Sequence, residues 1–122
     1  MSDTRSVPPT VGDIVVFRHA GTLFIFRVAG VGNDILAIVN GDLIRNAENL
    51  GTFHARAGAK KAYSLDMTPV RVEPGHVYLL GDNRDNNNDS RFMGQVNLEN
   101  VVGKVTGIRF SKEWSRIGTI FP

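Results

Sequence analysis

Residues 81–91 read GDNRDNNNDSR and bring carboxylates, amides and two guanidinium groups together in one short stretch. Such groups can bind a cation, brace a loop or form the polar part of a catalytic site. Acidic and amide residues alternate in it as the ligands of an EF-hand calcium loop do, at Asp85, Asn87 and Asp89. Ser90 stands where that loop requires glycine, and Val96 stands where it requires a bidentate glutamate. The spacing therefore argues against calcium.

Other metal ligands are scattered along the chain. The three histidines share no i, i+4 or short-loop spacing and are His19, His54 and His76. The sequence contains no cysteine, whereas zinc and related metals need several His, Cys or acidic ligands at close spacing. We therefore expect neither a metal nor a cofactor.

A structural role for the same stretch is also open. Asp, Asn and Ser side chains bond neighbouring backbone groups in turns. Arg84 and Arg91 can each make two-pronged bonds to the nearby carboxylates of Asp82, Asp85 or Asp89. Such a loop would lock the strands on either side of it together.

The elements around this stretch favour a mainly β fold. Short runs rich in Val, Ile and Phe recur between glycine- and asparagine-containing breaks, and no run keeps a helical period for long. Two hairpins are predicted: residues 13–18 and 22–29 around His-Ala-Gly, and residues 34–39 and 42–46 around Asn40-Gly41.

In the second half of the sequence, apolar and polar residues follow a less regular pattern. Residues 47–62 are polar and small, which predicts a long excursion between strands. Further strands are predicted within residues 62–67, 70–80 and 101–110, with a turn at Pro74-Gly75. Residues 111–118 could hold one helical turn, capped by Ser111 and closed by Gly118.

Length and composition fit a single globular domain over residues 1–122, with a polar N-terminal segment at residues 1–10. The net charge is only +2, and acidic and basic residues alternate, so no nucleic acid is expected as a partner. No apolar run approaches the roughly 20 residues of a membrane-spanning helix. The polar start lacks the apolar core of a secretory signal peptide.

The polar stretch resembles the motif G-D-N-R-D-N-S-x-D-S-R of type I signal peptidases. It matches at Gly81, Asp82, Asn83, Arg84, Asp85, Asn86, Asp89, Ser90 and Arg91. The flanking segments PGHVYLLGDN, RFMGQV and VVGK are also similar to the family pattern, as are VGDIVVF, FRVAGVGND and NGDLIRN upstream. The resemblance covers most of the chain, from about Ser6 to Gly107.

This resemblance implies antiparallel β-sheets that form a partly open barrel, with a long inserted loop and little helix. It also implies a serine endopeptidase that removes signal peptides at the outer face of a membrane, with a serine nucleophile, a lysine general base and no cofactor. The partner would be an extended peptide or an exported precursor protein.

The match fails at the positions that carry out catalysis in the family. The family's base lysine corresponds to Phe26, and the serine that contacts this lysine corresponds to Asn87. Ser6, in SVPPT, is the candidate nucleophile, but the segment between Thr10 and Gly12-Asp13 is shorter than in the family. Because a serine hydroxyl needs a neighbouring group to take its proton, we expect impaired catalysis. The protein would then bind an extended peptide or assist secretion or surface assembly.

Two alternatives stay open. One is an active endopeptidase with an unrecognised base, although Lys60, Lys61, His19 and His76 have no spacing that supports this role. The other is a nucleic-acid or regulatory module on a similar fold. The family places the domain at the extracytoplasmic face of a bacterial membrane if an anchor precedes it; otherwise a soluble cytoplasmic protein is expected. The sequence leaves the oligomeric state open.

Overall fold

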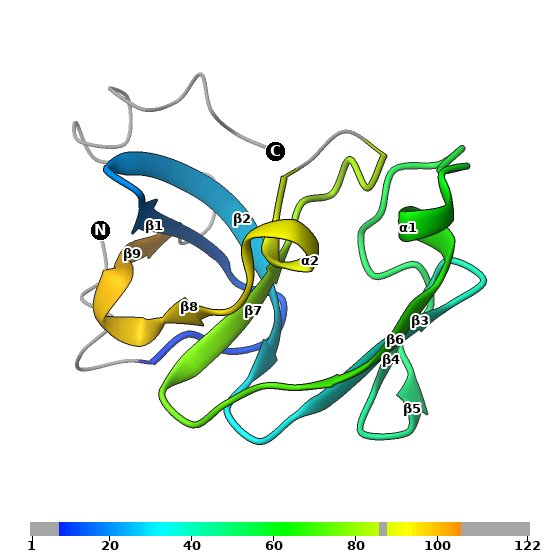
Figure 1. The fold of residues 1–122 in the computed structure, drawn as a ribbon, viewed down its shortest axis with the longest axis horizontal. Coiled ribbons are helices and arrows are strands. Elements are labelled where there is room, and N and C mark those ends of the chain that lie inside the picture. Colours follow the sequence, from blue (N-terminus) through cyan, green and yellow to red (C-terminus); the bar gives the residue numbers. More distant parts are fainter. Residues whose placement is uncertain (1–7, 86–87, 106–122) are drawn as a thin grey trace.

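A computed structural model describes residues 8–85 and 88–105 of the chain. The strands form two open antiparallel sheets, which confirms the predicted mainly β fold (Figure 1). The five-stranded sheet has the order β8-β7-β2-β1-β9, and the four-stranded sheet has the order β5-β4-β3-β6. The strands are β1 (Ile14–His19), β2 (Thr22–Val31), β3 (Ile35–Val39), β4 (Asp42–Arg45), β5 (Glu48–Asn49), β6 (Met67–Arg71), β7 (His76–Leu80), β8 (Val96–Asn97) and β9 (Val101–Val105). Three short helical turns join them: α1 (Ala62–Leu65), α2 (Ser90–Met93) and η1 (Leu98–Asn100).

Both predicted hairpins are confirmed. The β1–β2 turn consists of Ala20 and Gly21, because His19 already pairs with Thr22. Asn40 and Gly41 form the β3–β4 turn, with φ angles of 49° and 87°. Positive φ at both central residues matches the right-handed twist of the flanking strands.

The second half departs from prediction in two places. Residues 62–65 form α1 instead of a strand, and β6 begins only at Met67. The reason is tertiary, since the Ser64 hydroxyl and the backbone N–H groups of Lys60 and Lys61 all donate to the carboxylate of Asp85. The predicted excursion at 47–62 also contains β5, which pairs with β4.

The remaining predictions for this half have mixed outcomes. The Pro74-Gly75 turn is confirmed, with Gly75 at φ 75° and a hydrogen bond from the His76 N–H to the Glu73 carbonyl. Strand β9 accounts for the first half of the predicted strand at 101–110. Residues 106–110 and the helical turn predicted at 111–118 lie outside the described residues.

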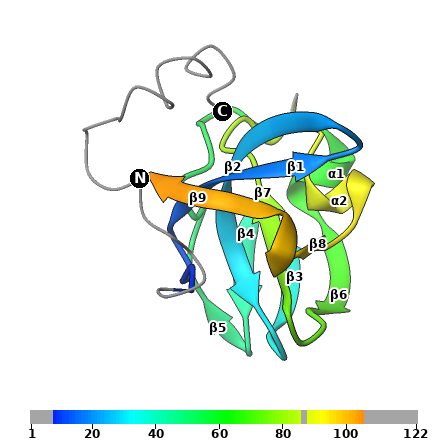
Figure 2. The same cartoon turned by 90° about the vertical axis from the view of Figure 1, so that its left-hand side faces the viewer.

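Strand β7, which lies behind β9 in the view of Figure 2, contributes side chains to two apolar clusters. Val77 and Leu79 face a cluster that includes Phe17, Phe26 and Val28, whereas Tyr78 and Leu80 face a cluster with Leu36, Ile38 and Leu43. Alternate residues of a strand point to opposite faces, so a single strand contributes to both clusters. The polar loop, residues 81–91, therefore begins where the two clusters meet.

Asp34 fixes the connection between the two sheets. Its carboxylate accepts hydrogen bonds from the Val31 N–H at 2.9 Å, from Arg45 Nε at 2.8 Å and from Asn46 Nδ2 at 2.9 Å. Burial raises the pKa of Asp34, but these hydrogen bonds and the Arg45 charge outweigh it and hold the pKa below its ordinary value.

Replacing Asp34 with asparagine should lower the free energy of unfolding at pH 7 by about 1–3 kcal/mol, as for a lost charged hydrogen-bond acceptor. Because the folded pKa is lowered, this stabilisation is complete above the ordinary aspartate pKa of about 3.9 and disappears as the pH falls through the folded value. The difference between wild type and Asp34→Asn, measured by urea unfolding, should therefore shrink in acid. Asp42→Asn, the same change in β4, is the control: the Asp42 carboxylate accepts a hydrogen bond from Asn49 Nδ2 at 3.2 Å, and this variant should lose less free energy of unfolding at pH 7 than Asp34→Asn.

Candidate functional site

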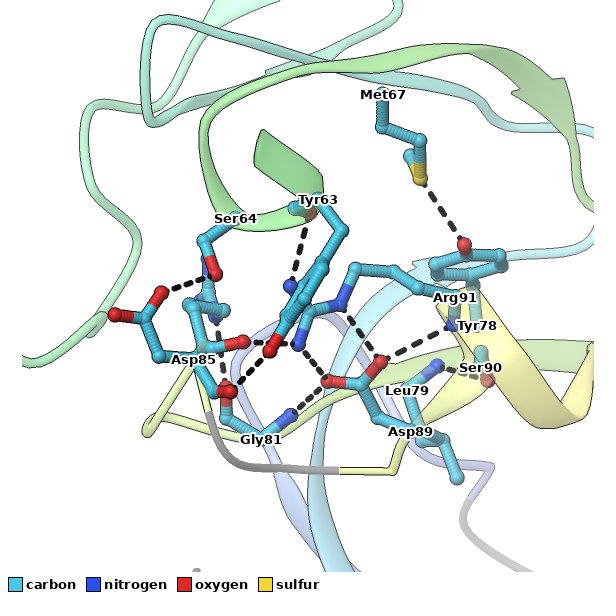
Figure 3. Close-up of polar contacts among 11 residues, drawn as sticks. Tyr63, Ser64, Met67, Tyr78, Leu79, Gly81, Asp85, Asp89, Ser90 and Arg91 are labelled. Atoms are coloured by element: carbon cyan, nitrogen blue, oxygen red, sulfur yellow. Dashed lines mark hydrogen bonds and ion pairs between the residues drawn. The ribbon is translucent and has the colours of Figure 1, made fainter. Parts of the chain in front are cut away.

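The polar loop is built around a buried carboxylate. Asp89 is fully buried and accepts hydrogen bonds from the Gly81 N–H at 2.9 Å and from Arg91 Nε at 2.8 Å (Figure 3). Arg91 Nη2 also donates to Asp89 at 2.9 Å, so the pair is two-pronged, as the sequence suggests. Only 3% of the Arg91 side chain is exposed. The ion pair therefore ties the end of β7 to the start of α2.

The rest of the Arg91 guanidinium binds backbone carbonyls. Nη1 donates to the Tyr63 carbonyl at 3.1 Å, and Nη2 donates to the Arg84 carbonyl at 2.8 Å. The guanidinium also lies 5.5 Å from the centre of the Tyr63 ring and 5.3 Å from that of Phe92, a range in which a cation is attracted to an aromatic ring. Arg91 thus joins α1, α2 and the polar loop.

Asp85 joins the excursion to the loop. The Ser64 hydroxyl donates to its carboxylate at 2.7 Å and, with the Lys60 and Lys61 N–H groups, lowers the pKa of Asp85. The Tyr63 hydroxyl donates to the backbone carbonyl of Asp85. The carboxylate therefore serves as an acceptor for the segment that leads into α1.

Arg84 binds backbone carbonyl groups, whereas the sequence suggested that it pairs with a carboxylate. Its Nε donates to the Gly81 carbonyl at 2.7 Å and its Nη2 to the Phe53 carbonyl at 2.6 Å. The residue is 2% exposed, and Nη1 is buried without a hydrogen-bond acceptor. Burial, helped by the neighbouring charge of Arg91, lowers the pKa of Arg84 to about 10. Of the three carboxylates expected as its partners, Asp82 is bound by Arg27, Asp89 by Arg91 and Asp85 by the Ser64 hydroxyl.

Arg27 links the polar loop to the N-terminal part of the sheet. Its guanidinium makes two bonds to the Asp82 carboxylate, at 3.1 and 3.0 Å, and donates to the Gly12 carbonyl at 3.0 Å. Ser90 adds a second link, since its hydroxyl accepts from the Leu79 N–H at 2.9 Å. The motif residues that the structure describes thus serve mainly to hold backbone segments in place.

Phe26 lies in an apolar environment. It is 6% exposed and belongs to the cluster with Val15 and Val28. Its ring lies 5.9 Å from that of Phe17 and 6.1 Å from that of Phe24, the latter nearly parallel at 17°. The position assigned by resemblance to a base lysine is therefore occupied by a packed aromatic ring.

The other residues predicted for catalysis are not all within the described part of the chain. Ser6, Asn86 and Asn87 lie outside it. Lys60 and Lys61 are exposed on the excursion, while the ring of His19 lies edge-on to Phe24 and His76 contacts the Pro74 carbonyl. Within residues 8–85 and 88–105, no three His, Asp or Glu side chains are grouped closely enough to hold a metal ion.

Sequence reasoning missed Lys104. Val15 lies opposite both Phe26 and Lys104 in the sheet, and directly opposite residues point to the same face. The Lys104 side chain is 15% exposed, and its Nζ lies 3.6 Å from Asp13 Oδ2. Only strand order could reveal this proximity, because the two residues are far apart in sequence.

The buried ion pair gives a stability prediction. Lysine cannot reproduce the planar, multiply bonded guanidinium of Arg91, so Arg91→Lys should lower the free energy of unfolding by about 3 kcal/mol, near the effect of breaking a buried pair. Arg45→Lys, at a more exposed pair, should lower it by about 1 kcal/mol or less. Urea unfolding at pH 7 measures both, and equal losses would contradict a special role for the buried pair.

Comparison with known proteins agrees with this geometry. The family described as signal peptidase, peptidase S26, matches residues 3–110. A probable signal peptidase I-1 of Synechocystis sp. is 30% identical, with 92% of this chain and 61% of that protein covered. Signal peptidase I of Pseudomonas aeruginosa is also 30% identical, with 97% of this chain and 59% of that protein covered. The chain thus spans about three fifths of the length of these curated relatives.

A solved structure supports the fold. The crystal structure of a signal peptidase I from Enterococcus faecalis V583 superposes with a TM-score of 0.71 at 24% sequence identity. The match covers 80% of this chain and 97% of that chain. With the family match over most of its length, the chain belongs to the signal peptidase family, peptidase S26.

Proposed function

We propose that this chain is a signal peptidase-like protein that binds an extended peptide but is impaired in acyl transfer. The observation that carries the proposal is the burial of Phe26 in a stack of three aromatic rings. The phenyl ring of Phe26 has no lone pair that accepts a hydroxyl proton, so it cannot activate a serine as a lysine or histidine does.

An open edge of β2 supports peptide binding. Strand β2 pairs with β1 along Thr22–Arg27, but its pairing with β7 begins only at Arg27, opposite Leu80. Strand β2 therefore continues past the end of β7 (Figure 1). Within residues 8–85 and 88–105, no strand pairs with the other side of residues 23–26.

The direction of the backbone groups at this edge follows from the ladder. The Val28 N–H donates to the Asp13 carbonyl, on the β1 side. Because successive residues point their backbone groups to alternate sides, Phe26 and Phe24 also face β1, whereas Ile25 and Leu23 face the open side. An added peptide strand would form its hydrogen bonds with Ile25 and Leu23, in the manner of β-strand addition.

The alternative of an active endopeptidase has one candidate base. Lys104 shares a sheet face with Phe26 and is largely buried. Its ammonium already pairs with the Asp13 carboxylate, which also accepts hydrogen bonds from the Thr10 N–H and hydroxyl. These contacts are typical of a lysine with a structural role. They therefore favour a catalytically impaired protein over an active endopeptidase.

The family membership suggests which partner supplies the peptide and at which face of the membrane it binds. Signal peptidases act on exported precursor proteins at the extracytoplasmic face of a membrane, and we assign the same partner and face to this chain. No helix in the described part of the chain has the length and apolar character needed to cross a membrane.

The first test concerns catalysis. The wild type should not cleave a peptide with alanine before the scissile bond, as measured by mass spectrometry over hours. The double variant Phe26→Lys with Asn87→Ser should restore slow cleavage, because it returns an amine and its hydroxyl partner to their family positions.

Two control variants accompany this test. Phe26→Met keeps the apolar volume, should cost less than about 1.5 kcal/mol of stability, and should stay inactive. Ser6→Ala in the double variant should abolish the restored cleavage. Cleavage by the wild type that depends on Ser6 and is lost in Lys104→Met would overturn the proposal and establish the alternative.

The second test concerns binding. An acetylated, alanine-rich peptide should slow amide hydrogen exchange at Leu23 and Ile25 by about tenfold or more at saturation, since these N–H groups would gain partners. The Phe24 and Phe26 amides, already bonded to β1, should change little. A peptide N-methylated at alternate residues lacks the necessary donors and should bind more weakly. Peptide binding that leaves the Leu23 and Ile25 amides unchanged would rule out this edge.

A further inference from the structure

The four-stranded sheet, which lies at the lower right in Figure 1, carries an apolar strip on the face that points away from its cluster. Leu36 and Ile38 of β3 are buried in that cluster. Because alternate residues of a strand point to opposite faces, Ile35, Ala37 and Val39 form an outer strip on the opposite face. Ile35 is 52% exposed and Val39 is 54% exposed, so the outer strip includes two of the four exposed large apolar side chains in the described part of the chain.

The neighbouring strands widen the outer strip. Ile44 of β4 lies opposite Ala37 and shares its face. On the other side, a register shift leaves Thr68 and Pro69 of β6 opposite Ala37, and both are exposed. The edges of this sheet are poorly suited to strand addition, because proline lacks an N–H group and β5 consists of two residues. A partner would therefore contact the face of the sheet.

The two ends of the outer strip differ in charge. Arg71 of β6 lies opposite Ile35, and Asp42 of β4 lies opposite Val39. Asp66, which precedes β6, is at the same end as Asp42, since its carboxylate accepts a hydrogen bond from the N–H group that follows Val39. The strip is therefore basic beside Ile35 and acidic beside Val39.

Within residues 8–85 and 88–105, the charged groups at the two ends make hydrogen bonds to neutral groups and no ion pair. Arg71 donates to the side-chain oxygen of Asn33 at 2.9 Å. Asp42 accepts from Asn49 Nδ2 at 3.2 Å. Both ends can therefore bind a group of opposite charge.

The other charged residues of this region lie away from the outer strip. Arg45 lies opposite Leu36 and opposite Glu48 in the sheet, so both charged residues belong to the face of the buried cluster. Glu73 belongs to the turn before β7, where the Gln95 side chain accepts a hydrogen bond from its N–H group. The outer strip thus has Arg71 at one end and two carboxylates at the other, and these ends are complementary to each other.

We propose that a second copy of this chain covers the outer strip, through the contact of two outer strips about a two-fold axis. Such an axis, crossing β3, reverses one strip relative to the other, so that the Arg71 end of each copy lies over the acidic end of its partner. The contact is then self-complementary, and each ion pair occurs twice. Apolar residues at the centre with charged residues at the rim match the usual anatomy of a protein interface.

The size of the face limits the strength of this contact. Four strands of at most five residues present a face of roughly 300 Å² per copy at the usual strand spacing and rise, which is below the standard size of stable interfaces. We therefore expect a weak and reversible dimer. The inference does not depend on the peptide-binding proposal, since it uses only the four-stranded sheet and neither Phe26 nor β2.

One experiment measures the association and its apolar part. Sedimentation velocity of the full chain at low salt, from about 10 µM to about 1 mM, should show a monomer–dimer equilibrium. Val39→Ser removes apolar area from the contact in both copies and should weaken the dimer about tenfold or more. Val102→Ser makes the same change at an exposed position of β9 and should leave the association unchanged.

Charge exchange tests the relative orientation of the two copies. Arg71→Glu makes both ends of the outer strip acidic, and Asp42→Lys with Asp66→Lys makes both ends basic, so each variant alone should dimerise about tenfold more weakly. Mixed in equal amounts, the two variants should associate at least as well as the wild type, because every contact then joins opposite charges. Association in the mixture also shows that both variants are folded. Arg18→Glu, at an exposed position of β1, is the control and should dimerise like the wild type.

Three results would refute the dimer: a chain that stays monomeric over this range, equal effects of Val39→Ser and Val102→Ser, or a mixture of the charge variants that does not associate. Vesicles of phosphatidylglycerol in phosphatidylcholine test the other occupant. If the chain stays monomeric but the vesicles retain it, and Val39→Ser alone reduces this retention, the outer strip contacts a lipid surface and the second copy is excluded.

Discussion

A carboxylate with no contact to water organises the polar half of this protein. Removing an ionised carboxylate from water is unfavourable by several kcal/mol unless its charge and lone pairs are matched, and Asp89 is matched by Arg91 and by the Gly81 N–H. Arg91 in turn needs acceptors for its remaining N–H groups, and it finds them in the carbonyls of Tyr63 and Arg84. Satisfying one buried ion pair therefore positions α1, α2 and the loop between β7 and α2.

The position of this network follows from strand β7. Strand β7 contributes alternate side chains to two apolar clusters, and the chain that leaves its end at Leu80 carries mainly charged and amide residues. It turns into a polar loop that fills the space above the strand with charged hydrogen bonds. Strand β2, which is longer than its neighbour, continues past this point, so part of its edge has no strand partner within residues 8–85 and 88–105. The same termination of β7 thus accounts for both the braced loop and the open edge.

Phe26 is a residue at which this chain departs from the family pattern. Its ring completes an aromatic stack with Phe17 and Phe24, and this burial stabilises the five-stranded sheet. A lysine at the same position would need desolvation to act as a base, at a cost to stability. The chain therefore combines a well-packed sheet with an edge of β2 that has no strand partner within the described residues, and the hydrogen bonds of the polar loop brace the backbone that follows β7. The proposed function treats peptide binding and catalysis as separable properties of this fold.

Local chemistry allowed much of this to be predicted. The Asn40-Gly41 turn follows from two residues that tolerate positive φ, Gly21 supplies the same freedom in the β1–β2 turn, and the mainly β fold follows from short apolar runs. The polar motif by itself indicated the family. The sequence also showed that Phe26 replaces the lysine of the family pattern. In contrast, the helical turn at 62–65, the carbonyl partners of Arg84 and the approach of Lys104 to the face of Phe26 were decided by tertiary structure. These features depend on contacts between residues distant in the chain, and local propensity is too weak to specify which partner a buried charge or a short segment finds.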